Sequence, residues 1–192
     1  MKIKEITFVA LFAALMGALG LVPPITLSFS PVPITLQTLG VLIAGGVLGA
    51  RLGAMSQIIF LLLVATGMPL LSGGRGGISV FVGPSVGYLI AWPITAYCIG
   101  YLLNRFKTLK LQHVLLINLT VGILLIYLIG IPIQAFMMNI SVLQAVKISL
   151  VYIPGDVLKA ILASVLVYRL RKHPVFLRSL GTSYSNQTSK NI

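Results

Sequence analysis

Long stretches without a charged residue are the feature that most limits what this chain can fold into. Four of them, residues 6–50, 52–74, 76–104 and 111–146, contain no Asp, Glu, Lys or Arg. Each reaches or exceeds the roughly 20 residues that a helix needs to cross the hydrocarbon core of a bilayer. A hydrophobic content of 58% and a mean hydropathy of +1.06 agree with this. The sequence therefore excludes a soluble domain and predicts an all-α integral membrane protein.

Prolines, glycines and charges divide these stretches into six expected transmembrane helices, about 5–22, 35–50, 52–68, 84–104, 112–138 and 155–171. Residues 1–172 would form a single six-helix membrane domain. A connector rich in proline follows the first helix. Residues 139–153 mix polar and apolar residues at near-helical spacing, which is typical of an amphipathic segment lying on the membrane surface. Residues 173–192 are polar, and we expect a disordered cytoplasmic tail there.

The positive charges predict the orientation. The net charge of +12 comes from short basic clusters between apolar stretches, a pattern that indicates membrane topology rather than nucleic-acid binding. A cytoplasmic N-terminus puts eleven of the fourteen basic residues inside, namely Lys2, Lys4, Arg51, Arg105, Lys107, Lys110, Arg169, Arg171, Lys172, Arg178 and Lys190. Arg75 and Lys147 would lie outside, and Lys159 at the membrane edge. We therefore expect a multi-pass protein of the cell membrane, in contact with lipids, with both termini in the cytoplasm.

Two opposite charges interrupt the last expected helix. Asp156 and Lys159 share a helix face because they are three residues apart. A charge at the centre of a membrane helix costs about 2.5–3.5 kcal/mol. Pro154 and Gly155 would place Asp156 in the first helical turn, where the helix dipole favours a carboxylate. The spacing leaves two interpretations open: the charges neutralise each other as a structural pair, or they hold a polar ligand between helices.

A glycine-rich loop is expected at the same membrane face as this pair. Residues 72–77 read Ser-Gly-Gly-Arg-Gly-Gly, with Arg75 among four glycines. Without Cβ atoms this backbone can approach a ligand closely, although a flexible linker has the same composition. The topology brings the loop, the proline connector and Asp156 together at the outer face. A mainly apolar region with a few polar groups is typical of a small-molecule site.

The sequence lacks the patterns of common enzyme chemistry. No G-x-x-x-x-G-K-[ST] motif is present to cradle a nucleotide phosphate. One cysteine, Cys98, and the absence of a Cys, His and acid cluster argue against a metal site, and a single intramembrane acid argues against a paired-carboxylate hydrolase. We expect no catalytic residue, no metal and no cofactor. A proton carrier using Asp156 stays open, although no inverted repeat of the kind found in many transporters is evident.

Small residues on one face of the first expected helix are typical of a close contact with another helix. Ala10, Ala14 and Ala18 recur every fourth residue. Such a face lets a second helix approach closely. Packing within the protein explains the same spacing equally well.

Three stretches in this order closely resemble the BioY family, the biotin-binding S components of energy-coupling factor (ECF) transporters. They are Pro31-Val-Pro-Ile-Thr-Leu-Gln37 leading into Gly45-Gly46-Val-Leu-Gly49, Gly73-Gly-Arg-Gly-Gly77 leading into Val82-Gly-Pro-Ser-Val-Gly-Tyr88, and Pro154-Gly-Asp-Val-Leu-Lys159. The resemblance covers about residues 5–171. It implies a six-helix S-component fold and a biotin site near the outer face. It also implies assembly with a membrane coupling subunit and two ATP-binding-cassette (ABC) ATPases, with the alanine face docked on the coupling subunit.

The resemblance also implies roles for particular residues. Asp156 and Lys159 match the polar pair of the family's last helix, and the loop with Gly74, Arg75 and Gly76 matches its substrate loop. Asp156 would accept hydrogen bonds from the ureido N–H groups of biotin, with Lys159 donating to the ureido carbonyl or tethering Asp156, and Arg75 binding the carboxylate. An inverted pose with Lys159 on the carboxylate is equally allowed.

We expect three secondary contacts as well, from Gln37, Tyr88 and Tyr152. The alternative to an ATPase-driven S component is a solitary or proton-coupled carrier of biotin or another small vitamin.

Overall fold

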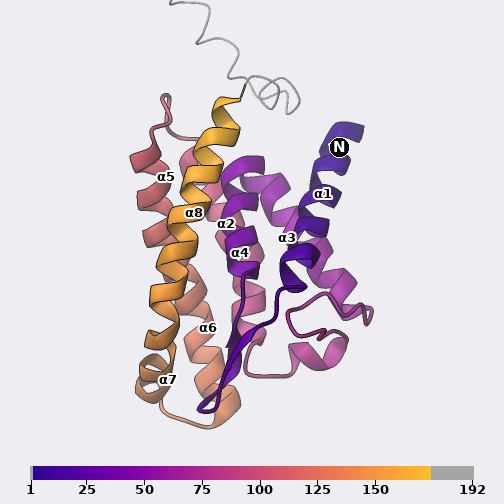
Figure 1. The fold of residues 1–192 in the computed structure, drawn as a ribbon, viewed down its shortest axis with the longest axis vertical. Coiled ribbons are helices and arrows are strands. Elements are labelled where there is room, and N and C mark those ends of the chain that lie inside the picture. Colours follow the sequence, from indigo (N-terminus) through magenta and orange to yellow (C-terminus); the bar gives the residue numbers. More distant parts are fainter. Residues whose placement is uncertain (1, 174–192) are drawn as a thin grey trace, which may run out of the picture.

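Helices run along the length of an elongated bundle in the computed structural model, which describes residues 2–173 (Figure 1). The α-helices are α1 (Ile3–Gly20), α2 (Gln37–Leu48), α3 (Ala50–Ala65), α4 (Val86–Leu103), α5 (Leu111–Ile117), α6 (Ile123–Met138), α7 (Val142–Ser149) and α8 (Ile153–Lys172). Two 3-10 helices, η1 (Ile78–Phe81) and η3 (Leu150–Tyr152), and one π-helix, η2 (Asn118–Gly122), complete the helical elements of this part of the chain. The prediction of a helical protein is confirmed.

The proline-rich connector between α1 and α2 forms a short antiparallel β hairpin. Its strands are β1 (Ile25–Leu27) and β2 (Ser30–Ile34). The hairpin and α7 lie at one end of the bundle, whereas the two ends of the described chain lie at the other (Figure 1). Apart from His173, the predicted polar tail lies outside the described residues.

Within residues 2–173, four helical stretches have the length and composition to cross a membrane. They are α1, α4, the continuous stretch Leu111–Met138 and the continuous stretch Val142–Lys172. The remaining apolar helices, α2 and α3, contain 12 and 16 residues, or about 18 and 24 Å at the helical rise of 1.5 Å per residue. Six expected spans thus correspond to four long helical stretches and two short helices.

The short helix α2 is surrounded by protein. Every residue from Gly40 to Leu48 is buried, and α2 packs against α1, α3, α4 and α8. Glycines permit this close packing: a Cβ on Gly45 would lie 2.5 Å from the carbonyl O of Ala96, and one on Gly46 would lie 2.5 Å from Cγ2 of Val167. Because neighbouring helices enclose α2, the position of its first turn relative to α8 is fixed.

The fifth expected span is one helical stretch with a π-helical turn inside it. The π-helix Asn118–Gly122 separates α5 from α6. Gly122 lies against α2, where an added Cβ would be 2.7 Å from Cδ2 of Leu42. Such wide turns inside α-helices are frequent near functional sites.

The last helix begins differently from the prediction. Residues 139–153 contain the expected helix, here α7, capped by the Ser141 side chain, which accepts a hydrogen bond from the Gln144 N–H. The 3-10 helix η3 then connects α7 to α8 directly, so Asp156 in the first turn of α8 follows earlier helical turns. The helix dipole therefore stabilises the Asp156 carboxylate less than it would at a free helix N-terminus. Side-chain partners must stabilise this carboxylate instead.

Candidate functional site

A cavity lies between the β hairpin, the loop after α3, and helices α4, α6 and α8. The space between its walls, counted out to the open solvent at its mouth, is about 580 Å³. Its wall is largely apolar, with aromatic side chains at Tyr88, Trp92, Tyr127 and Tyr152. The polar side chains that line it come from segments far apart in the sequence.

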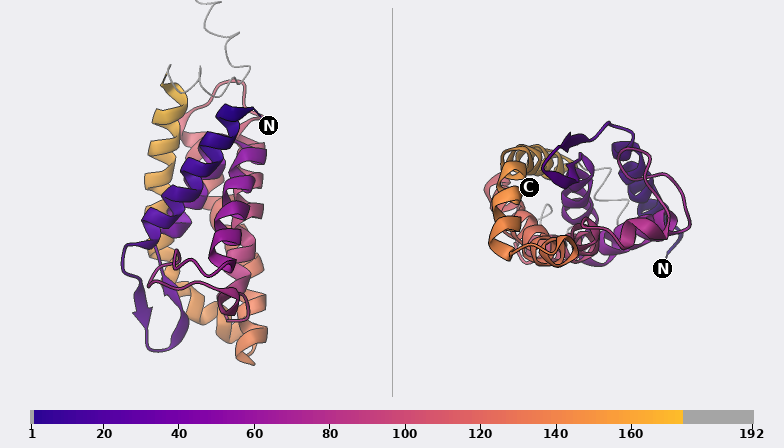
Figure 2. Two further views of the ribbon diagram at one scale, coloured as in Figure 1. Left: turned by 90° about the vertical axis from the view of Figure 1, so that its right-hand side faces the viewer. Right: turned by 90° about the horizontal axis from the view of Figure 1, so that it is seen from below.

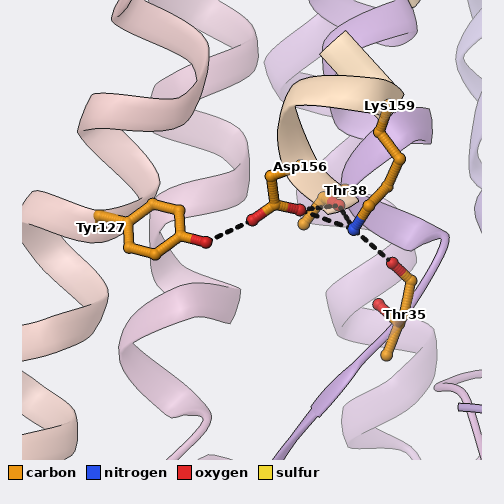
Figure 3. Close-up of polar contacts among 5 residues, drawn as sticks. All are labelled: Thr35, Thr38, Tyr127, Asp156 and Lys159. Atoms are coloured by element: carbon orange, nitrogen blue, oxygen red, sulfur yellow. Dashed lines mark hydrogen bonds and ion pairs between the residues drawn. The ribbon is translucent and has the colours of Figure 1, made fainter. Parts of the chain in front are cut away.

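The polar centre of the cavity is the pair predicted from the sequence. Lys159 Nζ lies 2.6 Å from Asp156 Oδ1. Lys159 also donates to the Thr35 carbonyl at 2.8 Å and to the Thr38 hydroxyl at 2.9 Å. The Tyr127 hydroxyl donates to Asp156 Oδ2 at 2.5 Å, from the side opposite Lys159 (Figure 3). The pair is therefore held by α2, α6 and the segment that follows β2.

Asp156 and Lys159 differ in how many of their hydrogen-bonding positions remain unused and could bind a ligand. The Lys159 ammonium has three N–H donors, and the contacts with Asp156, Thr35 and Thr38 use all three. Asp156 Oδ1 accepts from Lys159 and, at 3.4 Å, from the Thr38 hydroxyl, whereas among residues 2–173 only Tyr127 donates to Oδ2. A carboxylate oxygen can accept about two hydrogen bonds. Asp156 Oδ2 thus retains room for one more donor at a side chain that is 14% exposed.

Arg75 lies at the edge of the same cavity, on a tight turn that we call the glycine hairpin, Leu71–Arg75. Leu71 and Arg75 exchange backbone hydrogen bonds at 3.0 and 3.2 Å, and Gly73 and Gly74 between them have φ of 80° and 69°. The Arg75 Nε donates to the Ser72 carbonyl at 3.3 Å. Partial burial lowers the pKa of the Arg75 guanidinium, which still remains charged near neutrality. Its terminal nitrogens can bind an anion.

The glycines around Arg75 shape the turn and do not line the cavity. Gly74 takes the left-handed conformation that a glycine adopts without strain. Gly76 packs against the backbone, because an added Cβ would lie 2.2 Å from the Met68 carbonyl O. Neither residue is in the cavity wall, which from this turn includes Leu71 and Arg75. The close approach that glycine permits is therefore between Gly76 and the backbone of Met68.

The three expected secondary contacts all line the cavity, but their polar atoms have protein partners. The Tyr88 hydroxyl donates to Gln134 Oε1 at 2.7 Å and lies 3.1 Å from the Ser149 hydroxyl. The Tyr152 hydroxyl contacts the buried Ser30 hydroxyl in β2. Gln37 makes three hydrogen bonds to the backbone. These residues therefore organise the cavity wall.

Sequence reasoning missed three groups at the polar centre. The Tyr127 hydroxyl, the Thr38 hydroxyl and the Thr35 carbonyl each contact Asp156 or Lys159. Thr35 and Thr38 lie beside Gln37, inside the proline-containing motif Pro31–Gln37 or directly after it. Attention to polar residues next to that motif could have found Thr38, whereas Thr35 contacts Lys159 through its backbone carbonyl, which its residue type does not indicate. Tyr127 is one aromatic in an apolar stretch and carries no such signal.

The alanine face of α1 points away from the bundle. Ala10, Ala14 and Ala18 are all exposed, whereas Ala13, Met16 and Gly17 on the other side of the helix are buried. Packing within the described protein therefore does not explain the alanine spacing.

The fold and site can be compared with known proteins. A crystal structure of the S-component for biotin from an ECF-type ABC transporter matches with a TM-score of 0.85 and 41% identity over 89% of this chain and 92% of that one. The probable biotin transporter BioY of Bacillus subtilis (strain 168) is 48% identical over 170 residues, 88% of this chain and 91% of the relative. The biotin transporter BioY of Rhizobium etli is 44% identical over 86% of this chain and 92% of the relative.

These likenesses and the helical cavity define a transport component of membranes rather than an enzyme. The model of the BioY family matches residues 1–174. The chain belongs to the BioY family.

Proposed function

We propose that this protein is the biotin-binding S component of an ECF-type transporter in the cell membrane. The observation that carries the proposal is the Asp156–Lys159 pair in a largely apolar cavity, with one acceptor site of Asp156 still available. Biotin combines an apolar valeryl chain with a ureido ring and a carboxylate. The cavity offers matching chemistry, because Asp156 can accept from an N–H and aromatic walls can cover the apolar part.

The hydrogen bonds favour one of the two poses that the sequence left open. Lys159 would have to give up an existing partner to bind a carboxylate, whereas Asp156 Oδ2 can accept a ureido N–H without losing one. Of the two described cations that line the cavity, Arg75 is the one with unused donors, since only its Nε has a partner there. We therefore infer that the ureido ring binds at Asp156 and the carboxylate at Arg75.

The remaining features concern orientation and partners. The likeness to an ECF-type S-component supports six membrane-crossing segments with both termini in the cytoplasm and the cavity at the outer face. The exposed alanine face of α1 supports docking on a membrane coupling subunit that works with two ABC ATPases. A solitary carrier would not need this face.

A binding screen tests the proposed function. Isothermal titration of the purified protein in detergent against the water-soluble vitamins should give the highest affinity for biotin. In liposomes, uptake should require the coupling subunit and ATPases together with ATP. Tighter binding of a different vitamin would overturn the specificity, and uptake by the protein alone in response to a pH gradient would establish the carrier alternative.

Replacing Tyr127 by Phe should weaken biotin binding, because the Asp156 carboxylate loses the donor that holds Oδ2 in place. Hydrogen bonds to charged groups contribute about 1.5–3 kcal/mol, which sets the expected loss. Tyr88→Phe is the matched control in the same cavity, since its hydroxyl bonds Gln134 and not the charged pair. Isothermal titration should show the larger loss for Tyr127→Phe; equal losses would contradict the assignment.

Replacing Arg75 by Gln tests the pose through the ligand. Biotin should bind more weakly by about 1.5–3 kcal/mol, the range for a hydrogen bond to a charged group. Biotin amide, which lacks the charged carboxylate, should bind both proteins about equally. Titration of the two ligands against the two proteins forms a double-mutant cycle. A loss of the same size for the amide would show that Arg75 does not bind the carboxylate.

A further inference from the structure

Gln37 connects parts of the molecule that are distant in sequence. Its Nε2 donates to the carbonyl O of Met16 in α1 at 3.1 Å and to the carbonyl O of Leu70 at 3.0 Å. Its Oε1 accepts from the backbone N–H of Ser72 at 3.2 Å. The residue is 1% exposed. Because an amide nitrogen has two donors, both are committed to the protein, and Gln37 joins α1 to the start of the glycine hairpin.

On the ligand side, Gln37 is linked both to the charged pair Asp156–Lys159 and to Arg75. It precedes Thr38, whose hydroxyl contacts Asp156 and Lys159. Its partner Ser72 also accepts, through its carbonyl, a hydrogen bond from Arg75 Nε. A movement of the Gln37 amide would therefore displace the glycine hairpin that carries Arg75 relative to the charged pair.

On the other side, Gln37 reaches the buried face of the helix that exposes the alanines. Met16 is buried, between the exposed Ala14 and Ala18 in sequence. The junction depends on Gly20, because a Cβ there would lie 2.1 Å from the Leu70 carbonyl O and 2.9 Å from Gln37 Nε2. At Gly17, one turn earlier on α1, an added Cβ would meet only Cδ2 of Leu70, at an ordinary 3.4 Å. In the left view of Figure 2, α1 (indigo) runs from the N-terminus down towards the end of the bundle that carries the β hairpin.

We propose that Gln37 is a positioning residue that couples the alanine face of α1 to the ligand cavity. A shift of α1 on docking is passed through the Met16 and Leu70 carbonyls to the glycine hairpin, and it changes the affinity for biotin. Linkage makes this reciprocal, so biotin changes the affinity for the docked partner by the same factor. The inference rests on the proposed function, since it takes biotin as the ligand and the coupling subunit as the partner of α1.

The test measures a ratio of affinities. Biotin dissociation constants are determined for the isolated protein and for its complex with the coupling subunit and ATPases. For the wild type, the two constants should differ by a factor in the usual range of about 5–150. In Gln37→Met, which keeps the volume and removes all three hydrogen bonds, the ratio should fall towards one, because the coupling between the two sites is lost. A merely structural role would weaken both affinities together and leave the ratio unchanged.

Two alanine substitutions on α1 provide the matched comparison. Gly20→Ala should lower the ratio as Gln37→Met does, because its Cβ displaces the Leu70 carbonyl, whereas Gly17→Ala should keep the wild-type ratio. If Gln37→Met does not fold, the comparison of Gly20→Ala with Gly17→Ala decides, and equal ratios in these two overturn the proposal. A wild-type ratio of one, with biotin binding and complex formation intact, overturns the coupling alone. A wild type that fails to bind biotin overturns the proposed function itself.

Discussion

Asp156→Asn and Lys159→Ala should each weaken biotin binding by about 2–5 kcal/mol, the usual cost of removing one partner of a buried, hydrogen-bonded charge pair. This corresponds to a loss of about thirtyfold to several thousandfold in the dissociation constant. Asp156→Asn removes the charge that accepts the ureido N–H and leaves Lys159, which is 6% exposed, without its counter-ion. Lys159→Ala leaves the Thr35 carbonyl without this donor and frees Asp156 to move. Isothermal titration of the purified variants measures both effects.

The double variant Asp156→Asn with Lys159→Met separates ligand binding from structural pairing. Removing one partner of a buried ion pair is costly because it leaves an uncompensated charge, and the double variant leaves none, so it should unfold at a temperature close to that of the wild type. It should still fail to bind biotin tightly. A double variant with wild-type affinity would mean that the two charges only neutralise each other. Near-wild-type affinity in both single variants would reject the site.

The sequence predicted this pair because both residues lie in one helix. Asp156 and Lys159 are three residues apart, so helical geometry alone brings them to one face, and the structure places their charged atoms 2.6 Å apart. The helical segments were predictable for a similar reason, since hydrophobic length is a local property. The structure moves the ends of these segments by a few residues, with α1 ending at Gly20 and α8 beginning at Ile153, and it joins α8 to α7 through η3.

The groups that surround the pair could not be predicted, because they depend on how helices pack. Tyr127 is 29 residues from Asp156, and its hydroxyl reaches the carboxylate only because α6 lies beside α8 in this register. The π-helical turn that precedes α6 is not visible in the composition, since it accommodates the packing of Gly122 against Leu42. Gln37 was expected as a secondary contact of the ligand, and it does line the cavity. Its partners, 21 to 35 residues away, are backbone groups.

Ala14→Trp should abolish ATP-driven biotin uptake while leaving biotin binding by the isolated protein unchanged. Ala14 is exposed at the centre of the alanine face, between Ala10 and Ala18. Two helices approach closely only where small residues meet, so an indole at this position would keep the coupling subunit away. The side chain points out of the bundle, and the cavity is lined by other elements, so the site itself should not change. Uptake into proteoliposomes containing the full complex, together with titration of biotin against the isolated variant, measures the two properties.

Leu128→Trp is the matched control for this substitution, because it also adds an indole to an exposed position of a membrane helix. Leu128 lies on α6 and is 63% exposed; α6 packs against α4 and α7, whereas α1 packs against α2 and α3. A tryptophan there should face lipid and leave both uptake and binding at wild-type levels. Co-purification with the coupling subunit should be lost for Ala14→Trp and retained for Leu128→Trp. Undiminished uptake by Ala14→Trp would mean that the partner docks elsewhere, and the coupling through Gln37 would then lose its mechanical starting point.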